Sequence, residues 1–437
     1  MTPGSIRQRA ARTGAPPTVR QQKQTPKVQE WYHGLLPPSC VKAMVRQNGD
    51  FLVRRRIEEE IPTDAVAVMW DKQVHSLPIR KAENKKERVY IGDKEFDNVN
   101  DLIAWYQQKG EPIGKEGIML LNPIPRQSWE VRREQLTLKK KLGKGAFGEV
   151  WLADYLKSNS KKIAVAVKKS HSDRLSKGDI EEMMSEARVQ SKFKHKNVVR
   201  FYGVAAETSP VMLVMEYVEK GSLDKYLQKQ KREGETLSPR RLTGMCLDAA
   251  SGVRYLHSMQ CIHRDIAARN CLITNDGLVK ISDFGQSKEG GLHRLGAHEQ
   301  VPIKWLALET LTDRVFTFKS DVWSFGITIW EIFSHGAEPY PGLKTTEVQQ
   351  KLKNDDYRMT PPSAMPPRLG ALMARCWLRE PSARPDFETI ESELTAIEQT
   401  LGSGGDARVP SSAAALSGSG SRSSNKSNKD TVDTDSN

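Results

Sequence analysis

The stretch from Cys261 to Gly285, CIHRDIAARNCLITNDGLVKISDFG, constrains this chain more than any other part of its sequence. It opens with His263-Arg264-Asp265, continues with Asn270 five positions after the aspartate, and closes with Asp283-Phe284-Gly285. Short apolar runs lie around each polar group. Single triplets of these kinds occur by chance in polar loops. Their order, spacing and apolar flanks together indicate one functional site.

The residue types in this stretch resemble the motifs of a protein kinase, which transfers the γ-phosphoryl group of ATP. That transfer requires metal ions to neutralise spreading charge, and a carboxylate to orient the attacking hydroxyl group and accept its proton. The resemblance therefore implies that Asp265 is the base. It also implies that Asn270 and Asp283 bind Mg²⁺, with Mn²⁺ as the alternative ion.

The length of 437 residues, 38% of them hydrophobic, allows two or three compact domains. No apolar run approaches the roughly 20 residues that span a bilayer, and the sequence begins with neither a signal peptide nor an N-myristoylation pattern. The five cysteines include no Cys-x-x-Cys pair, which favours reduced thiols. We therefore expect a cytoplasmic protein, with recruitment to the inner face of the plasma membrane depending on charge or on partners.

The formal net charge of +13 raises the question of nucleic-acid binding. Residues 1–29 contain six basic residues and no acidic one, which predicts a disordered basic arm. Elsewhere acidic and basic residues interleave, without an array of aromatic residues for stacking on bases. We therefore expect no nucleic-acid partner, and an arm that is solvated or drawn to acidic surfaces, including a membrane.

A second site is indicated between Trp31 and Pro125, where the apolar run Phe51-Leu52-Val53 predicts a buried strand and Arg54 follows it directly. An arginine in this position either frays at the strand end or rises from the core to hold a phosphate group by two hydrogen bonds. The region resembles a Src-homology-2 (SH2) domain. That resemblance implies a phosphotyrosine site formed by Arg54, Arg56 and His75.

This region also departs from the SH2 pattern. Pro38 stands where relatives carry a helix arginine that clamps the phosphotyrosine ring, Arg56 replaces a serine, and Leu77 offers no compensating lysine. Arg55 and Arg56 are the candidates for replacing the lost contacts. The resemblance to an SH2 domain still implies that tyrosine-phosphorylated proteins are partners.

A glycine-rich loop, G-x-G-x-x-G-x-V, runs from Gly143 to Val150, and Val165-Ala166-Val167 predicts a buried strand that delivers Lys168. Glycines let backbone amides approach phosphates closely, although they also mark ordinary hairpins. The kinase resemblance implies that Lys168 pairs the ATP phosphates and that Glu186 is its ion-pair partner. The implied ATP pocket comprises Leu142, Gly143, Gly145, Gly148, Val150, Ala166, Lys168, Met215, Glu216, Val218 and Leu272.

Three further patterns concern the helical part of the chain. A helix is predicted to begin near Asp179, with Glu182 completing a capping box. Apolar spacing predicts a second helix from Ser238 to Met259, and an almost wholly apolar central helix begins at Asp321. We also expect an ion pair between Arg384 and Glu309.

Two motifs resemble protein-tyrosine kinases: Ala267-Ala268-Arg269-Asn270 in the catalytic loop, which adds Arg269 to the catalytic residues, and a substrate platform with Pro302, Lys304 and Trp305. The order of domains is similar to the Fes/Fer non-receptor kinases, without their long N-terminal region. The implied fold is α+β and multidomain, with an SH2 sheet flanked by two helices, then a bilobal kinase with a β-rich N-lobe and a helical C-lobe. The predicted boundaries are a basic arm (1–29), an SH2 domain (30–125), a linker (126–135), a kinase domain (136–396) and a disordered Ser/Gly-rich tail (402–437).

Three departures from that family concern activity. No tyrosine lies between Asp283 and Glu309, and His293 stands where relatives carry the activation-loop tyrosine. We hypothesise that Glu289 or Glu299 replaces the phosphate that Arg264 would otherwise hold, or that the loop stays poorly ordered. The other two departures are Gln190, at a position apolar in relatives, and Leu308, which replaces a proline.

Two hypotheses follow from the sequence. The first is an active tyrosine kinase that acts on protein tyrosines and is recruited by phosphotyrosine. The second is a catalytically silent scaffold that binds phosphotyrosine. The presence of Lys168, Glu186, Asp265, Asn270 and Asp283 favours the enzyme.

Overall fold

A computed structural model describes residues 29–58, 61–82, 88–145, 148–157, 161–170, 176–296, 299 and 301–402. The chain divides into two compact units between Ser128 and Trp129. No helix among the described residues is long and apolar enough to cross a membrane. The predicted basic arm and C-terminal tail, apart from Gln29 and Gly402, lie outside the described residues. Cys246, Cys261, Cys271 and Cys376 are buried free thiols.

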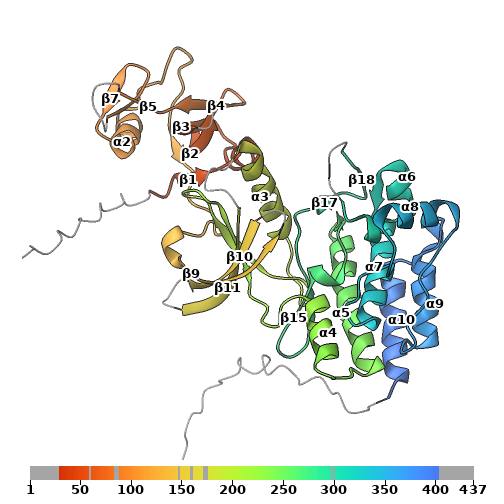
Figure 1. Ribbon diagram of the computed structural model, residues 1–437. Helices are drawn as coiled ribbons and strands as arrows, with labels where there is room; N and C mark the ends of the chain where they lie inside the picture. Colours follow the sequence, from red (N-terminus) through yellow and green to blue (C-terminus); the bar gives the residue numbers. More distant parts are fainter. Residues whose placement is uncertain are drawn as a thin grey trace, which may run out of the picture. The chain divides into compact units, whose positions relative to one another are not determined.

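The first unit is built on a central sheet in the order β1-β2-β3-β4 (Figure 1). Its antiparallel strands are β2 (Asp50–Glu58), β3 (Ile61–Trp70) and β4 (Gln73–Pro78). The short strands β1 (Tyr32–Leu35) and β8 (Asn122–Pro123) both pair parallel with β2. A smaller sheet consists of β5 (Arg80–Lys81), β6 (Val89–Ile91) and β7 (Lys94–Phe96). The helices are α1 (Pro38–Met44) and α2 (Val99–Lys109), so the predicted sheet with two helices is confirmed.

One face of the central sheet forms the core of this unit. The side chain of Asn98 caps α2 by accepting a hydrogen bond from the N–H of Asp101, and the helix ends at Gly110. The core consists of side chains of α2, β2 and β3 that are at most 5% exposed, namely Leu102, Ile103, Tyr106, Phe51, Val53, Val66 and Val68. Because side chains alternate along a strand, Arg54 lies on the opposite face of the sheet from Val53.

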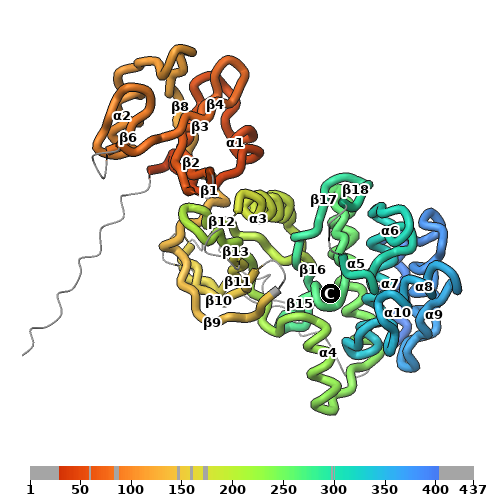
Figure 2. Tube along the Cα trace, turned by 45° about the horizontal axis from the view of Figure 1, so that its top comes forward, coloured from red at the N-terminus to blue at the C-terminus, as the bar shows by residue number. Residues whose placement is uncertain are grey.

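The second unit begins with a five-stranded sheet in the order β12-β13-β11-β10-β9 (Figure 2). Its strands are β9 (Leu136–Gly145), β10 (Gly148–Lys157), β11 (Lys161–Lys169), β12 (Phe201–Ala205) and β13 (Met212–Glu216). Helix α3 (Lys177–Gln190) begins after Ser176, whose hydroxyl accepts the N–H of Asp179 at 3.1 Å while the Asp179 carboxylate accepts the N–H of Ser176 at 2.9 Å. The helix therefore begins two residues before Asp179, and the predicted capping box of Asp179 with Glu182 was wrong, because Asp179 completes the box that Ser176 opens.

The residues just before this sheet belong to the second unit. Val131 is buried, and its N–H donates to the carbonyl of Val204 in β12 at 2.9 Å. Gly203 adopts a φ of +153°, and a Cβ there would lie 2.2 Å from the carbonyl oxygen of Trp129. Only glycine allows this close approach. Residues 129–135, predicted as linker, thus pack as part of this unit.

The rest of the second unit is helical (Figure 1). Its helices are α4 (Leu223–Arg232), α5 (Pro239–Ser258), α6 (Leu308–Asp313), α7 (Phe318–Phe333), α8 (Thr345–Asn354), α9 (Pro367–Cys376) and α10 (Phe387–Thr400). Helix α5 confirms the predicted helix, with Ser238 as its N-cap. Helix α7 is buried along nearly its whole length and packs against α5 and α9. It begins three residues before the predicted Asp321.

Short strands hold the loops of the motif-rich stretch in place. The pairs are β14 (Cys261–Ile262) with β17 (Lys288–Glu289), β15 (Cys271–Ile273) with β16 (Val279–Ile281), and β18 (Leu292–Arg294) with β19 (Val315–Thr317). The apolar runs noted in the sequence are β14, β15 and β16. The polar motifs therefore occupy loops whose two ends are both fixed.

Candidate functional site

The His263-Arg264-Asp265 loop is anchored to the central helix α7. The fully buried carboxylate of Asp321 accepts the backbone N–H of His263 at 2.8 Å and that of Arg264 at 2.9 Å, and it also contacts the ring of His257. Arg264 adopts a φ of +71°, an uncommon conformation for a residue other than glycine. Two hydrogen bonds from consecutive amides to one carboxylate hold this turn, and so fix the position of Asp265.

The predicted base lies within a small polar cluster. One carboxylate oxygen of Asp265 accepts a hydrogen bond from the side-chain nitrogen of Asn270 at 2.7 Å, and the other pairs with Arg269. The guanidinium of Arg269 lies 4.3 Å from the centre of the Trp305 ring. The structure therefore brings together Asp265, Arg269, Asn270 and Trp305. These residues came from three different sequence predictions.

A second cluster joins β11, α3 and the Asp283 loop. The ammonium of Lys168 lies 2.9 and 2.8 Å from the two carboxylate oxygens of Glu186 and 3.3 Å from a carboxylate oxygen of Asp283. Burial by itself would lower the pKa of Lys168, but the carboxylates of Glu186 and Asp283 outweigh burial and raise it. Lys168 is therefore a cation held between two acids, and its predicted pairing with Glu186 is confirmed.

The glycine-rich segment forms the hairpin of β9 and β10, in which Gly145 pairs with Gly148 and Gly143 with Val150. Gly148 has a φ of +150°, and a Cβ at this position would lie 2.1 Å from the carbonyl oxygen of Lys169. This glycine is therefore required by the backbone. Ala146 and Phe147 lie outside the described residues.

The other predicted ATP-pocket residues lie on neighbouring elements. In β10, β11 and β13, Val150 pairs with Lys168 and Ala166 pairs with Met215, which puts these four side chains on one face of the sheet. Leu142 is 42% exposed and Val218 is buried. Leu272 lies in β15 and forms a bridge with Ser222. The side chain of Glu216 pairs with Lys280 at 2.9 Å, so it contacts a lysine of β16.

The platform motif forms a short 3-10 helix, Ile303–Trp305, directly after Pro302. Lys304 pairs with Glu338 at 2.8 Å. The indole N–H of Trp305 donates to Glu331 of α7 at 3.0 Å. The platform is thus attached to the same central helix as the catalytic loop.

Arg264 finds a partner without any phosphate. Its side chain is 1% exposed, lies over the ring of Phe316, and donates to the carbonyl of Gln286 and to the carboxylate of Glu299, both at 3.2 Å. Burial would raise the pKa of Glu299, but the N–H of Gly296 and the Arg264 guanidinium outweigh it and lower the pKa. Pairing of Arg264 with a resident acid is therefore confirmed for Glu299.

The other predicted acid, Glu289, does not contact Arg264. It pairs instead with Lys192 at 2.8 Å, and both of these side chains are nearly half exposed. His293, at the position of the missing tyrosine, has its ring nitrogen 3.8 Å from Glu299. Burial and the neighbouring Arg264 lower the pKa of His293.

In the first unit, Arg54 and Arg56 form a cationic pocket on one face of the sheet. Arg54 is 7% exposed and donates to the carbonyl of Leu36 at 2.7 Å. Both guanidinium groups reach the hydroxyl of Ser76 at 3.5 Å. The Nε atoms of both arginines are buried with no partner among the described residues. Burial and the neighbouring charge of Arg56 lower the pKa of Arg54. Arg56 is partly exposed and pairs with Glu58 at 2.7 Å. A buried cation with an unused donor, such as Arg54, is typical of an anion site.

The prediction that His75 flanks this pocket was wrong. Within the sheet, His75 pairs with Val68, a core residue, whereas its neighbour Ser76 pairs with Ala67 on the face of Arg54. The His75 ring contacts the carbonyl of Trp70 at 3.2 Å and Glu116 at 3.1 Å. A shift of one residue along a strand moves a side chain to the other face, which is why the sequence match misplaced the histidine.

Arg55 also lies on the other face. Its guanidinium makes two hydrogen bonds to Asp64, at 2.9 and 3.1 Å. Because its side chain lies on the face away from Arg54, Arg55 does not reach the pocket, which corrects the expectation that it replaces phosphate contacts. Of the two candidates for that role, only Arg56 reaches the pocket of Arg54.

The protein-family models that the sequence matches agree with this geometry. Residues 136–394 match the model of the family described as protein tyrosine and serine/threonine kinase, which is more than half of the chain. The chain belongs to the protein kinase family. Residues 31–106 match the model of the SH2 domain.

Several known kinases are similar to this one over both units. Fer-related kinase 1 of Caenorhabditis elegans is 35% identical over 371 residues, which cover 84% of this chain and 93% of the relative. Tyrosine-protein kinase Fer of Homo sapiens is 37% identical over 378 residues, covering 85% of this chain and 44% of Fer. The transforming protein Fps of avian sarcoma virus is 36% identical over 375 residues. The chain thus spans less than half of the length of human Fer.

These similarities confirm the predicted fold and the resemblance to Fes/Fer kinases. The protein is a tyrosine kinase that carries a phosphotyrosine-binding SH2 domain.

Two carboxylates of the kinase were missed as site residues. Glu331 of α7 is 4% exposed and accepts hydrogen bonds from the backbone N–H of Ala268 at 2.9 Å and from the Trp305 indole at 3.0 Å. Burial raises the pKa of Glu331 to about 7. Asp321 is the second. The sequence signal that could have identified them is an acidic residue within an otherwise apolar helix, because a buried carboxylate requires a partner.

The two remaining departures have different consequences. Gln190 is 1% exposed, and its amide nitrogen makes one long hydrogen bond, 3.5 Å, to the carbonyl of Val199. Its side-chain oxygen is buried with no partner among the described residues. Glu309, next to Leu308, pairs through both oxygens with Arg384 at 2.8 Å, so the predicted ion pair is confirmed.

Proposed function

We propose that Asp265 orients and deprotonates the tyrosine hydroxyl of a protein substrate, while Lys168 holds the phosphates of ATP. The observation that carries this proposal is the contact of Lys168 with Glu186 at 2.8 Å and with Asp283 at 3.3 Å. In kinases the lysine and the helix glutamate must be paired for transfer to proceed. Here the pair is formed, and the acid of the Asp283 loop lies beside it.

Asn270 and Asp283 would hold Mg²⁺ together with the ATP phosphates. Mg²⁺ is usually bound through one or two carboxylates and substrate phosphates. Asn270 uses its amide nitrogen to contact Asp265, which leaves its oxygen for a cation. Burial would raise the pKa of Asp283, but the Lys168 ammonium outweighs burial and lowers it, so the carboxylate is charged. When bound, the ion would neutralise phosphate charge, and Mn²⁺ offers the same chemistry.

Arg269 would place the acceptor. It contacts the predicted base and lies over the ring of Trp305 in the platform motif. Pro302 and Lys304 precede Trp305 in the sequence. This arrangement supports a substrate segment lying along the platform, with its tyrosine hydroxyl beside Asp265.

The pocket of Arg54 and Arg56 would bind phosphotyrosine, with the hydroxyl of Ser76 between the two guanidinium groups. Pro38 has no donor to offer the phosphate, since it lies in the first turn of α1 without a backbone N–H. Arg56 would supply the second cation instead. Proteins phosphorylated on tyrosine are then the partners, and through them the kinase would reach the inner face of the plasma membrane from the cytoplasm.

The experiment measures phosphate transfer from Mg-ATP to a tyrosine polymer by wild-type protein, Lys168→Arg and Lys168→Met. Lys162→Met, on the exposed part of the same strand, is the matched control. We expect both Lys168 variants to lose activity by at least tenfold and the control to keep it. Rates at background level in all four proteins would favour a silent scaffold, and equal rates above background would overturn the role of Lys168. A circular dichroism spectrum of each variant reports whether it has folded.

A further inference from the structure

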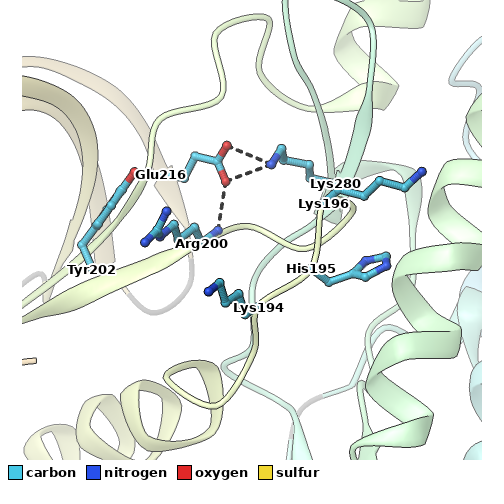
Figure 3. A pocket seen from close by; sticks show the side chains of 7 residues that line it. All are labelled: Lys194, His195, Lys196, Arg200, Tyr202, Glu216 and Lys280. Carbon is cyan, nitrogen blue, oxygen red and sulfur yellow. Dashed lines mark hydrogen bonds and ion pairs between the residues drawn. The ribbon is translucent and has the colours of Figure 1, made fainter. Parts of the chain in front are cut away.

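A cavity of about 310 Å³ lies where the segment after α3 meets the strands β12, β13 and β16 (Figure 3). Lys194, His195 and Lys196 line it from that segment. The other lining residues are Arg200, Tyr202, Glu216 and Lys280, and we call these seven residues the basic pocket. Apart from Glu216, none of them belongs to the proposed sites for ATP, tyrosine or phosphotyrosine.

The charge of the basic pocket is unbalanced. Lys194, Lys196, Arg200 and Lys280 line the cavity with a single carboxylate, that of Glu216. Lys194, Lys196 and Arg200 are exposed, and Figure 3 shows the Lys196 side chain extending away from Glu216. Glu216 is already used: it pairs with Lys280 at 2.9 Å and accepts the backbone N–H of Arg200 at 3.0 Å, as the dashed lines in Figure 3 show. No ion pair within the described residues involves the side chains of Lys194, Lys196 or Arg200. Three cations around the cavity therefore have no anionic partner in the described part of the chain.

Several donors of the pocket are held in place. The His195 ring stacks on Tyr255 at 4.8 Å, and its Nδ1 accepts the N–H of Asn197 at 3.2 Å, so in the neutral ring Nε2 carries the proton. Burial, followed by the charge of Lys196, lowers the pKa of His195 and keeps the ring neutral. The Arg200 guanidinium lies 5.4 Å from the centre of the Tyr202 ring. Less conformational entropy is lost when such groups bind a ligand.

We propose that the basic pocket binds a small anion with two or more phosphate groups, either free in solution or as the headgroup of a lipid. The volume is at the lower end of the range for small-ligand sites and exceeds the needs of a single phosphate. Ammonium and guanidinium groups around one cavity match closely spaced phosphates, because each forms charge-assisted hydrogen bonds. The single carboxylate is neutralised by Lys280 and does not repel such a ligand.

The test measures binding of inositol hexakisphosphate and of tripolyphosphate by isothermal titration calorimetry in 150 mM salt. All proteins carry Arg54→Ala, and an ATP-competitive inhibitor saturates the nucleotide site, so neither other phosphate site contributes. The test variant is Lys194→Ala with Lys196→Ala. The matched control is Lys225→Ala with Lys231→Ala, two exposed lysines of α4. Both double variants remove two positive charges from the surface.

We expect at least one probe to bind the reference protein and the control equally, and the test variant to bind it at least tenfold more weakly. Absence of binding of both probes, or equal binding by the test variant, would overturn the proposal. Vesicles with and without a phosphorylated inositol lipid distinguish the source. If the protein sediments only with vesicles that contain the phosphorylated lipid, and the test variant does not, the ligand is a lipid headgroup. If only the soluble probes bind, the ligand is free in solution.

Discussion

The contact between Glu299 and Arg264 predicts a kinase that does not wait for phosphorylation of its activation loop. In Glu299→Gln the shape of the side chain is kept and its charge is lost. A hydrogen bond to a charged group contributes about 1.5–3 kcal/mol, and the loss of one partner of a buried pair costs about 3–5 kcal/mol. The Glu299 side chain is 33% exposed, so solvent screens the pair and the lower figure applies. A loss of about 1.5–2 kcal/mol reduces the population of the paired loop by roughly 10–30-fold.

The assay is the initial rate of tyrosine-peptide phosphorylation by protein pretreated with phosphatase. Wild-type protein should react at a constant rate from the first time point, and Glu299→Gln should be slower by about 10–30-fold. Glu289→Gln is the control from the same loop. Its pair with Lys192 is nearly half exposed on both sides, so its rate should change by less than about fivefold. The reasoning is refuted if Glu299→Gln keeps the wild-type rate, or if wild-type activity rises during incubation with ATP.

Three further predictions concern single buried or misplaced groups. Burial raises the pKa of Glu331 to about 7, above the unfolded value of roughly 4.3. The contribution of Glu331 to stability is therefore present at low pH and is lost as the pH rises to about 7. Glu331→Gln should flatten the fall in Tm between about pH 5 and 7, and an unchanged profile would contradict this. Gln190→Leu removes a buried unpaired oxygen and should raise Tm by about 2–4 °C, so a lower Tm would argue against a cost at this position. Phosphotyrosine-peptide binding should weaken by about tenfold in Arg56→Ala and by less than about twofold in His75→Ala; the reverse order would restore the histidine to the pocket.

Much of the kinase site could be predicted because its residues are tied to buried strands and fixed spacings. The run Val165-Ala166-Val167 places Lys168 near the end of a buried strand. The five-residue separation of Asp265 and Asn270 lets their side chains meet within one loop. The pairs of Lys168 with Glu186 and of Arg384 with Glu309 join residues far apart in the sequence. The resemblance to kinases supplied those pairs, which periodicity alone does not predict.

The errors have physical causes. Strand β4 reads Gln-Val-His-Ser-Leu-Pro, in which polar and apolar residues do not alternate cleanly, so the sequence does not determine which of His75 and Ser76 faces the pocket. The start of α3 was misplaced because Ser176 and Asp179 cap each other. The role of Glu331 depends on hydrogen bonds to a distant backbone amide and an indole, which become visible only in the folded chain.

The central claim is that this chain transfers phosphate to tyrosine with Asp265 as the base. The most direct measurement compares kcat for a peptide containing one tyrosine and one serine, and the dissociation constant for ATP, in wild-type protein and Asp265→Asn. Loss of a general base should lower kcat by about 10²–10⁴-fold, whereas ATP binding should change by less than about twofold. All phosphate should be found on tyrosine. Equal kcat in the two proteins, or phosphoserine as the product, would contradict the claim.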